Sequence, residues 1–386
     1  MAQSFPLPVF HSGAPLYDQL YRHIAGAIQS GALSPGAKLP SKRRMCALAG
    51  VSMSTVETAY SLLAAEGYVL AKPRSGYVCA DLLPPAPGLA VPPVRAADPT
   101  PSRGASDRPT PAVDVSAFPF SSWARITKEA VYENPGLLQR GHPQGDEPLR
   151  AALASLLAQY RGVRCDPEQI VVGAGADYLL SLLLQLLPEQ RAVALEDPGY
   201  PAAYAAATLH GRQAVPIPVD GEGMCPEALA DSGAGLAYVT PSHQFPLGVT
   251  MPVGRRSRLL HWAASAPDRW IIEDDYDSEF RFTGRPIPTL QSIDTRERVL
   301  YMSTFSQTIS PSMRVGFMVL PPRLLERYRR ELGFYASTVP ALEQQVLARF
   351  LSGGGAGSWY EQHLSRTRKK YRLLRSAVLE TFAACP

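Results

Sequence analysis

Residues 271–280, IIEDDYDSEF, and residues 301–316, YMSTFSQTISPSMRVG, decide how the larger part of this chain folds. In the first stretch, an apolar run that begins at Trp270 passes directly into acidic side chains. This pattern predicts a buried parallel strand whose carboxyl end opens onto a crevice, where ligands usually bind. Asp274 and Tyr276 are two residues apart, so an extended backbone directs both side chains to one face, where they could hold a flat ligand.

The second stretch carries groups suited to a phosphate. Thr304 and Ser306 supply hydroxyls, and Arg314 supplies a guanidinium, which pairs well with phosphate oxygens. Together the two stretches resemble the pyridoxal-phosphate (PLP) site of fold-type I aminotransferases, and most closely that of the MocR-type members of the GntR family of transcription factors. The resemblance implies that Asp274 pairs with the pyridine nitrogen of PLP and that the Tyr276 hydroxyl bonds its ring oxygen.

In such proteins a lysine in the motif S-K-x-x-x-P-x-x-R-x-G forms a Schiff base with the cofactor. That position holds Gln307 in this chain. An amide nitrogen is not a nucleophile, so no covalent link to PLP can form there. The resemblance therefore implies noncovalent PLP binding, and no residue is assigned as catalytic.

Three further motifs fit the same resemblance. Residues 173–179, GAGADYL, follow an expected strand and open a helix whose free amides would hold the phosphate. Residues 196–200, EDPGY, end in a tyrosine that stands where an aromatic ring stacks on the pyridine, although core packing explains a tyrosine here equally well. Residues 240–248, TPSHQFPLG, would bring Gln244 and His243 near the ring oxygen. The complete predicted cofactor set is Gly175, Ala176, Asp177, Tyr200, Gln244, Asp274, Tyr276, Thr304, Gln307 and Arg314.

Composition places the chain among ordinary globular proteins. Its 386 residues, 46% hydrophobic and 19% charged, leave room for two or three domains. The five cysteines are scattered and form no C-x-x-C pair, so we expect neither a disulfide framework nor a metal site. No apolar run reaches transmembrane length and the N-terminus lacks a secretory pattern, so we expect a cytoplasmic protein without a membrane partner.

The net charge of +4 lies entirely in residues 1–80, where a polyanion would bind. Leucines and isoleucines recur every fourth position from Leu16 to Ile28, which predicts an amphipathic helix. We expect two further helices, at residues 42–49 and 53–66, and then a β-hairpin within residues 68–78.

This segment, residues 11–80, resembles the GntR-type winged helix-turn-helix domain through LPSKRRMCALAGVSMSTVETAYSLLAAEGYV and RSGYV. The resemblance implies that the helix at residues 53–66 enters the major groove of double-stranded DNA. Met53 stands where the family usually has an arginine; it can touch a thymine methyl but cannot donate a hydrogen bond. The residues assigned to DNA are Ser41, Lys42, Arg43, Ser52, Ser54, Thr55, Arg74 and Gly76.

Residues 81–111 are rich in proline and predict a semi-extended linker. Residues 112–386 alternate helical and strand patterns, with helices expected at 147–160, 178–187 and 202–209 and strands at 169–172, 192–195 and 236–240. The predicted fold class is α/β, with a mixed, mostly parallel sheet. The resemblance sharpens it to the large domain of a fold-type I aminotransferase, with the C-terminal small domain truncated.

Three functions remain open. The first is a homodimeric DNA-binding regulator whose large domain senses PLP or another small-molecule effector. The second is a PLP-dependent aminotransferase, which Gln307 argues against because glutamine is neither nucleophile nor base at neutral pH. The third is a degenerate chain whose large domain only dimerises the DNA-binding head.

Overall fold

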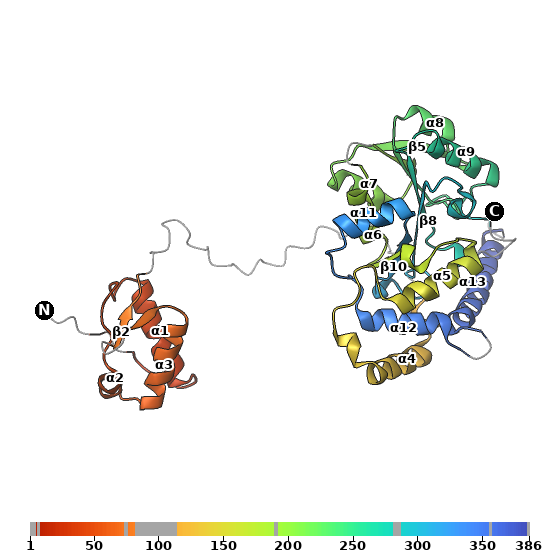
Figure 1. Ribbon diagram of the computed structural model, residues 1–386. Helices are drawn as coiled ribbons and strands as arrows, with labels where there is room; N and C mark the ends of the chain where they lie inside the picture. The colour runs from red at the N-terminus through yellow and green to blue at the C-terminus, as the bar shows by residue number, and fades with distance from the viewer. Residues whose placement is uncertain are drawn as a thin grey trace. The chain divides into compact units, whose positions relative to one another are not determined.

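The computed structural model describes residue 5 and residues 8–72, 76–81, 114–188, 192–280, 287–354 and 357–383. The chain forms two compact units, Met1–Arg108 and Pro109–Pro386 (Figure 1). The expected linker, apart from Asp81, and the expected wing-tip residue Arg74 lie outside the described residues.

The described residues of the N-terminal unit form three helices and a two-stranded antiparallel sheet. Their bounds are α1 Leu16–Gln29, α2 Lys42–Ala49, α3 Met53–Ala65, β1 Val69–Lys72 and β2 Gly76–Cys79. Local chemistry explains the start of α2, because Ser41 accepts a hydrogen bond from the Arg44 amide. Gly50 ends α2 in the left-handed conformation that suits glycine. The apolar stripe of α1 packs through Leu20 and Ile24 against α3.

The second unit is built on an eight-stranded sheet in the order β3-β10-β9-β8-β7-β4-β5-β6. The bounds are β3 Ile170–Gly173, β4 Val193–Asp197, β5 Ala214–Asp220, β6 Gly223–Met224, β7 Leu236–Val239, β8 Trp270–Asp274, β9 Val299–Thr304 and β10 Gly316–Val319. Strands β5, β4, β7, β8 and β9 run parallel, whereas β10 is antiparallel to both of its neighbours and β6 is antiparallel to β5. The fold is therefore mixed α/β with a mostly parallel sheet.

Helices cover both faces of this sheet (Figure 1). Their bounds are α4 Phe120–Glu133, α5 Glu147–Arg161, α6 Ala176–Leu186, α7 Pro201–Leu209, α8 Pro226–Asp231, α9 Val253–Ala264, α10 Leu290–Ile293, α11 Pro322–Glu331, α12 Ala341–Ser352 and α13 Trp359–Ala383. Successive side chains of β8 point to opposite faces of the sheet and so belong to different parts of the core. Ile272 packs with α6, α7 and α11 on one face, whereas Ile271 packs with α8, α9 and α10 on the other. Helices α4, α5, α12 and α13 pack around Tyr301 and Phe317 in a further cluster.

Strand β8 ends in acids, as the sequence predicts. Glu273 and Asp274 are its last two residues and are buried with the apolar residues that precede them. Among the described residues, no helix has the length and apolar character needed to cross a membrane. The described His, Cys, Asp and Glu side chains likewise form no group able to hold a metal ion.

Candidate functional site

The carboxyl ends of four adjacent parallel strands meet at one edge of the sheet. Strand β4 ends at Asp197, β7 at Val239, β8 at Asp274 and β9 at Thr304. Strand β10 begins at the same edge, because Gly316 pairs with Thr304. This edge is where open α/β sheets bind ligands, and the topology assembles there the strand ends and the loops that follow them.

Asp274 is the most unusual group at this edge. Its side chain is buried, and Oδ2 accepts a hydrogen bond from the Tyr238 hydroxyl on β7, whereas Oδ1 has no partner among the described residues. Burial raises the pKa of Asp274 to about 7; the Tyr238 hydrogen bond opposes this shift, and the neighbouring Asp275 adds to it. A buried, unpaired carboxylate oxygen is rare in proteins. It leaves an acceptor for a donor on a ligand, such as a protonated ring nitrogen.

Tyr276 lies two residues beyond Asp274 and is half-buried. Its ring stacks on that of His243, with centroids 6.1 Å apart and an interplanar angle of 18°. His243 Nδ1 lies 2.5 Å from Asp277 Oδ2, and this hydrogen bond raises the pKa of His243. The loop after β7 and the turn after β8 thus form one wall of the site.

Arg314 lies over the beginning of α6. Its Nη2 donates to the Ala174 carbonyl at 3.1 Å and reaches Asp177 Oδ2 at 3.4 Å. Gly175 precedes the helix at φ +88°, and a Cβ there would approach Arg314 Nη2 to 2.9 Å, so only glycine fits without strain. The guanidinium and the uncapped helix N-terminus together attract an anion.

The hydroxyls beside Arg314 have local partners. Thr304 Oγ1 is 2.8 Å from Ser306 Oγ and also donates to the Val315 carbonyl at 3.3 Å. The Tyr200 hydroxyl donates to Asp177 Oδ1 at 3.0 Å, while its ring meets Phe245 edge-on. Tyr200 is therefore held both by packing and by a hydrogen bond at the site.

Gln244 is buried and its amide is already engaged. Nε2 donates to the carbonyls of Pro198 and Phe245 at 2.9 and 2.6 Å, and Oε1 accepts from the Leu247 amide at 3.1 Å. These bonds anchor the loop after β7. The expected contact between Gln244 and a ring oxygen stays a prediction, since it requires the amide to exchange one of these partners.

Gln307 lines a cavity of about 520 Å³. Other lining side chains come from α5, α9 and α13 and from the loops after β7 and β8, among them Arg161, Ser242, His243, Arg256, Asp277, Ser278, Tyr371 and Arg375. No lysine is among the described lining residues. The lysines of residues 112–386 are Lys128, Lys369 and Lys370, of which the last pairs with Asp114.

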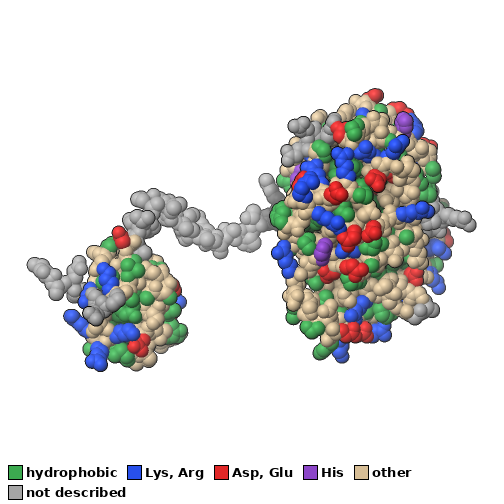
Figure 2. All heavy atoms as spheres, in the orientation of Figure 1, with side chains coloured by type: hydrophobic (Ala, Val, Ile, Leu, Met, Phe, Trp, Pro, Cys, Tyr) green, Lys and Arg blue, Asp and Glu red, His purple; other side chains and the backbone are tan. Residues whose placement is uncertain are grey.

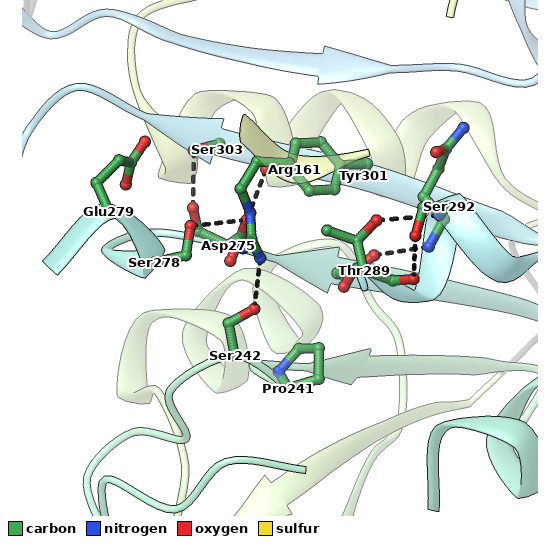
Figure 3. Close-up of polar contacts among 12 residues, drawn as sticks. Arg161, Pro241, Ser242, Asp275, Ser278, Glu279, Thr289, Ser292, Tyr301 and Ser303 are labelled. Atoms are coloured by element: carbon green, nitrogen blue, oxygen red, sulfur yellow. Dashed lines mark hydrogen bonds and ion pairs between the residues drawn. The ribbon is translucent and has the colours of Figure 1, made fainter. Parts of the chain in front are cut away.

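A buried network behind the site was not anticipated from the sequence (Figure 3). Arg161, the last residue of α5, donates through Nε to Asp275 Oδ2 at 2.6 Å and through Nη2 to Ser242 Oγ at 2.8 Å. The Tyr301 hydroxyl donates to the same Asp275 oxygen at 2.7 Å, and Ser303 Oγ donates to the Asp275 carbonyl at 2.7 Å. Burial alone would raise the pKa of Asp275, but Arg161 and the hydroxyls of Tyr301 and Ser242 together outweigh it, and the pKa is lowered.

This network fixes the turn that carries Tyr276. The sequence signal that could have revealed this network is the pair of adjacent acids, Asp274 and Asp275. Consecutive residues at a strand end face opposite sides of a sheet, so the two carboxylates need separate partners. A second buried acid requires a cationic partner, but nothing in the local sequence identifies it as Arg161.

The residues that the sequence assigns to DNA contact have different surroundings in the N-terminal unit. Ser52 caps α3 by accepting from the Thr55 amide at 3.2 Å, and its hydroxyl contacts those of Ser54 and Thr55. Lys42 pairs with Glu57 of α3 at 3.0 Å, so its charge is shared within the domain. Arg43 is exposed.

Gly76 begins β2 at φ +91°, with the exposed Lys38 passing close to it. Met53 is 40% exposed at the start of α3. On the face seen in Figure 2, blue Lys and Arg side chains outnumber red acidic ones on this unit, in keeping with its excess positive charge.

Comparisons with known proteins agree with this two-part organisation. Residues 16–78 match the bacterial regulatory proteins of the gntR family, and residues 111–384 match aminotransferase class I and II. The uncharacterized HTH-type transcriptional regulator YdeL of Bacillus subtilis is 42% identical over 371 residues, covering 95% of this chain and 79% of YdeL. The probable rhizopine catabolism regulatory protein MocR of Rhizobium meliloti is 37% identical, covering 92% of this chain and 75% of MocR.

The chain belongs to the MocR-type transcriptional regulators of the GntR family. A further MocR-type relative, the pyridoxine biosynthesis regulator PdxR of Corynebacterium glutamicum, is 34% identical, covering 97% of this chain and 81% of PdxR. As a MocR-type regulator, the protein joins a DNA-binding helix-turn-helix domain to an aminotransferase-like domain.

Solved aminotransferases share the fold of the second domain. Kynurenine aminotransferase of Pyrococcus horikoshii, in complex with PMP, kynurenine and product, aligns with a TM-score of 0.61 and 29% identity, covering 70% of this chain and 68% of the enzyme. α-Aminoadipate aminotransferase LysN of Thermus thermophilus, complexed with N-(5'-phosphopyridoxyl)-L-leucine, aligns with a TM-score of 0.61 and 28% identity, covering 71% and 70%. Each of these two solved structures was determined with a ligand bound, PMP in the first and N-(5'-phosphopyridoxyl)-L-leucine in the second.

Proposed function

We propose that this MocR-type regulator uses its aminotransferase-like domain to bind PLP or a related small molecule noncovalently, as an effector sensor and dimerisation unit. The observation that carries the proposal is the unpaired, buried Asp274 Oδ1 at the ligand edge of the sheet. It is combined with a phosphate-type site at Arg314 and a lining of the Gln307 cavity, among the described residues, that contains no lysine.

The residues present fit a PLP-type ligand at both of its ends. Asp274 Oδ1 would accept from the protonated pyridine nitrogen, and Arg314 with the amides at the start of α6 would hold the phosphate. Asp177 pairs with Arg314; its side chain is 54% exposed, so it can turn toward solvent when an anion binds. The remaining proposed contacts are Gly175, Ala176, Tyr200, Gln244, Tyr276, Thr304 and Gln307.

Catalysis by the usual aminotransferase chemistry is disfavoured by the same residues. Bound PLP supplies an electron sink, but removing the proton at Cα requires a base beside the reacting carbon. Gln307 cannot accept that proton at neutral pH, and none of the described residues lining its cavity is a lysine. The domain therefore holds and orients its ligand without turning it over.

A homodimer is part of the proposal. Leu138 and Phe334 are 95% and 69% exposed, and Arg140, which lies close to Leu138 in the chain, donates to the Phe334 carbonyl at 3.1 Å. Exposed apolar side chains that lie close together favour a protein interface. In each chain of the dimer, the DNA-binding domain, residues 11–80, is joined by the linker, residues 81–111, to the large domain, residues 112–386. A two-fold dimer would therefore present two DNA-binding domains to paired half-sites on DNA.

The test is a titration of PLP into the full chain, followed by absorbance and by borohydride trapping. We expect the parent to bind reversibly without trapping, whereas Gln307→Lys becomes trapped as a covalent adduct. Arg314→Ala should weaken binding about tenfold or more, since it removes a charge-assisted hydrogen bond to the phosphate. Arg327→Ala is the matched control, because that partly exposed arginine pairs with Glu331 away from the site.

Absence of PLP binding by both the parent and Gln307→Lys would remove PLP from the proposal. Operator binding, measured by fluorescence anisotropy on the same samples, would then show whether the DNA-binding role stands with a different effector, or with a large domain that only dimerises the head.

A further inference from the structure

The burial pattern of α3 decides which side chains this helix can offer to DNA. Four buried residues pack it into the core of the N-terminal unit: Val56, Ala59, Tyr60 and Leu63. The exposed residues between positions 53 and 61 are Met53, Ser54, Glu57, Thr58 and Ser61. In a helix-turn-helix pair the second helix lies in the major groove, and residues near its N-terminus contact base edges. The exposed face of α3 is therefore the face that meets the bases.

This face lacks the side chains that usually read purines. Residues 53–65 contain no arginine, lysine, asparagine or glutamine. Arginine and lysine are the common donors to guanine, whereas asparagine and glutamine pair with adenine through two hydrogen bonds. The Ser54 hydroxyl already contacts that of the capping Ser52 at 2.9 Å. Glu57 is thus the only charged residue between positions 53 and 65.

Glu57 is held in place while one of its oxygens stays available. Lys42 Nζ of α2 donates to Glu57 Oε1 at 3.0 Å, and the Glu57 side chain is 52% exposed. This ion pair joins the two helices and leaves Oε2 to accept a hydrogen bond from another group. The lysine also offsets the negative charge of the carboxylate, which the phosphates beside the groove would otherwise repel.

A carboxylate distinguishes the bases by the edges that they present in the major groove. Guanine presents two acceptors, and thymine presents an acceptor beside a methyl group, so neither offers a donor. Adenine presents the N6 donor beside the N7 acceptor, and this acceptor is unfavourable for a carboxylate oxygen. Cytosine presents its N4 donor without a neighbouring acceptor of its own. Cytosine is therefore the base that a carboxylate on this face fits best.

We propose that Glu57 is a specificity-determining residue that reads a cytosine in the operator by accepting a hydrogen bond from its N4 amino group. Lys42 positions the carboxylate for this contact. The inference rests on the DNA-binding role of the helix-turn-helix domain and is independent of the proposed effector. The same contact disfavours guanine and thymine at that position, because their acceptors would leave the carboxylate without a hydrogen-bond partner.

The experiment is the selection of bound duplexes from a random-sequence DNA library by the full chain and by three variants. We expect the parent to enrich cytosine at one position. Glu57→Gln should move that preference to adenine, since an amide pairs with N6 and N7, and Glu57→Ala should lose it while other positions keep theirs. Glu66→Gln is the matched control, because Glu66 lies at the other end of α3 and accepts from the Tyr21 hydroxyl; it should select the same sequence as the parent.

A second measurement tests the atom that is read. N4-methylcytosine in a base pair carries a methyl group where the N4 amino group would donate into the major groove. Replacing the selected cytosine by this base should weaken binding of the parent about tenfold, within the usual cost of one mismatched base pair. It should leave binding of Glu57→Ala unchanged. Fluorescence anisotropy at one fixed salt concentration measures both.

A parent that enriches no position in cytosine would overturn the inference. The same selected sequence for the parent, Glu57→Gln and Glu57→Ala would also overturn it, as would equal weakening by N4-methylcytosine in the parent and in Glu57→Ala. Binding of each variant to unselected DNA, which depends on the phosphates rather than on the bases, checks that the domain is folded.

Discussion

Replacing Arg161 by methionine should destabilise the large domain by about 3–5 kcal/mol, the usual cost of leaving one member of a buried ion pair unpaired. The Arg161 side chain is 8% exposed and that of Asp275 is fully buried, so water cannot replace the lost guanidinium. The Tyr301 and Ser278 hydroxyls still donate to Asp275, which places the expected loss toward the lower end of that range.

The assay is denaturant unfolding of the full chain followed by tryptophan fluorescence. The signal is specific for the large domain, because all tryptophans lie there: Trp123, Trp262, Trp270 and Trp359. Arg327→Met is the control, since its ion pair with Glu331 is exposed and solvent screens it, so it should change stability far less.

The loss should also depend on pH. Arg161 holds the folded-state pKa of Asp275 below its usual value, so the pair stabilises the parent above the unfolded-state pKa, and this contribution is lost as pH falls through the folded-state pKa. Without Arg161, burial raises that pKa instead, so Asp275 can be protonated at mildly acidic pH and the penalty should be smaller at pH 5 than at pH 8. The double variant Arg161→Met, Asp275→Asn should recover much of the loss. A penalty equal to that of Arg327→Met, or one independent of pH, would refute this account of the network.

Three other outcomes follow from individual contacts. Tyr238→Phe removes the hydroxyl that lowers the pKa of Asp274, so that pKa should rise and the onset of PLP binding should move to higher pH; titrations from pH 6 to 9 that show an unchanged onset would contradict this. Ser52→Ala removes the cap of α3 and should cost the N-terminal unit about 1 kcal/mol, measured by amide hydrogen exchange in α3. Arg43→Ala should weaken binding to all DNA sequences alike and reduce the salt slope of log K by about 0.9, measured by anisotropy at several salt concentrations.

Much of the secondary structure follows from local sequence. The helix predicted at residues 42–49 forms with those bounds, because a serine before it caps the free amides and a glycine after it adopts the left-handed conformation. The β-strand at Trp270 follows from its apolar run, although the strand continues through Glu273 and Asp274. The sequence predicts that this strand ends in acids, but it does not identify the groups that pair with them once they are buried.

The candidate site divides in the same way. The sequence by itself determined which chemical groups the strand ends and loops carry: an acid at the end of one strand with a tyrosine two residues later, an arginine after another strand, and glutamine at position 307. Only the tertiary structure decided which groups remain available, since Tyr238 occupies one oxygen of Asp274 and Arg161 neutralises Asp275 from 114 residues away. Hydrogen-bond partners that lie so far apart along the chain leave no periodic signal in the sequence. The order and register of the strands in the folded sheet decide which of them meet.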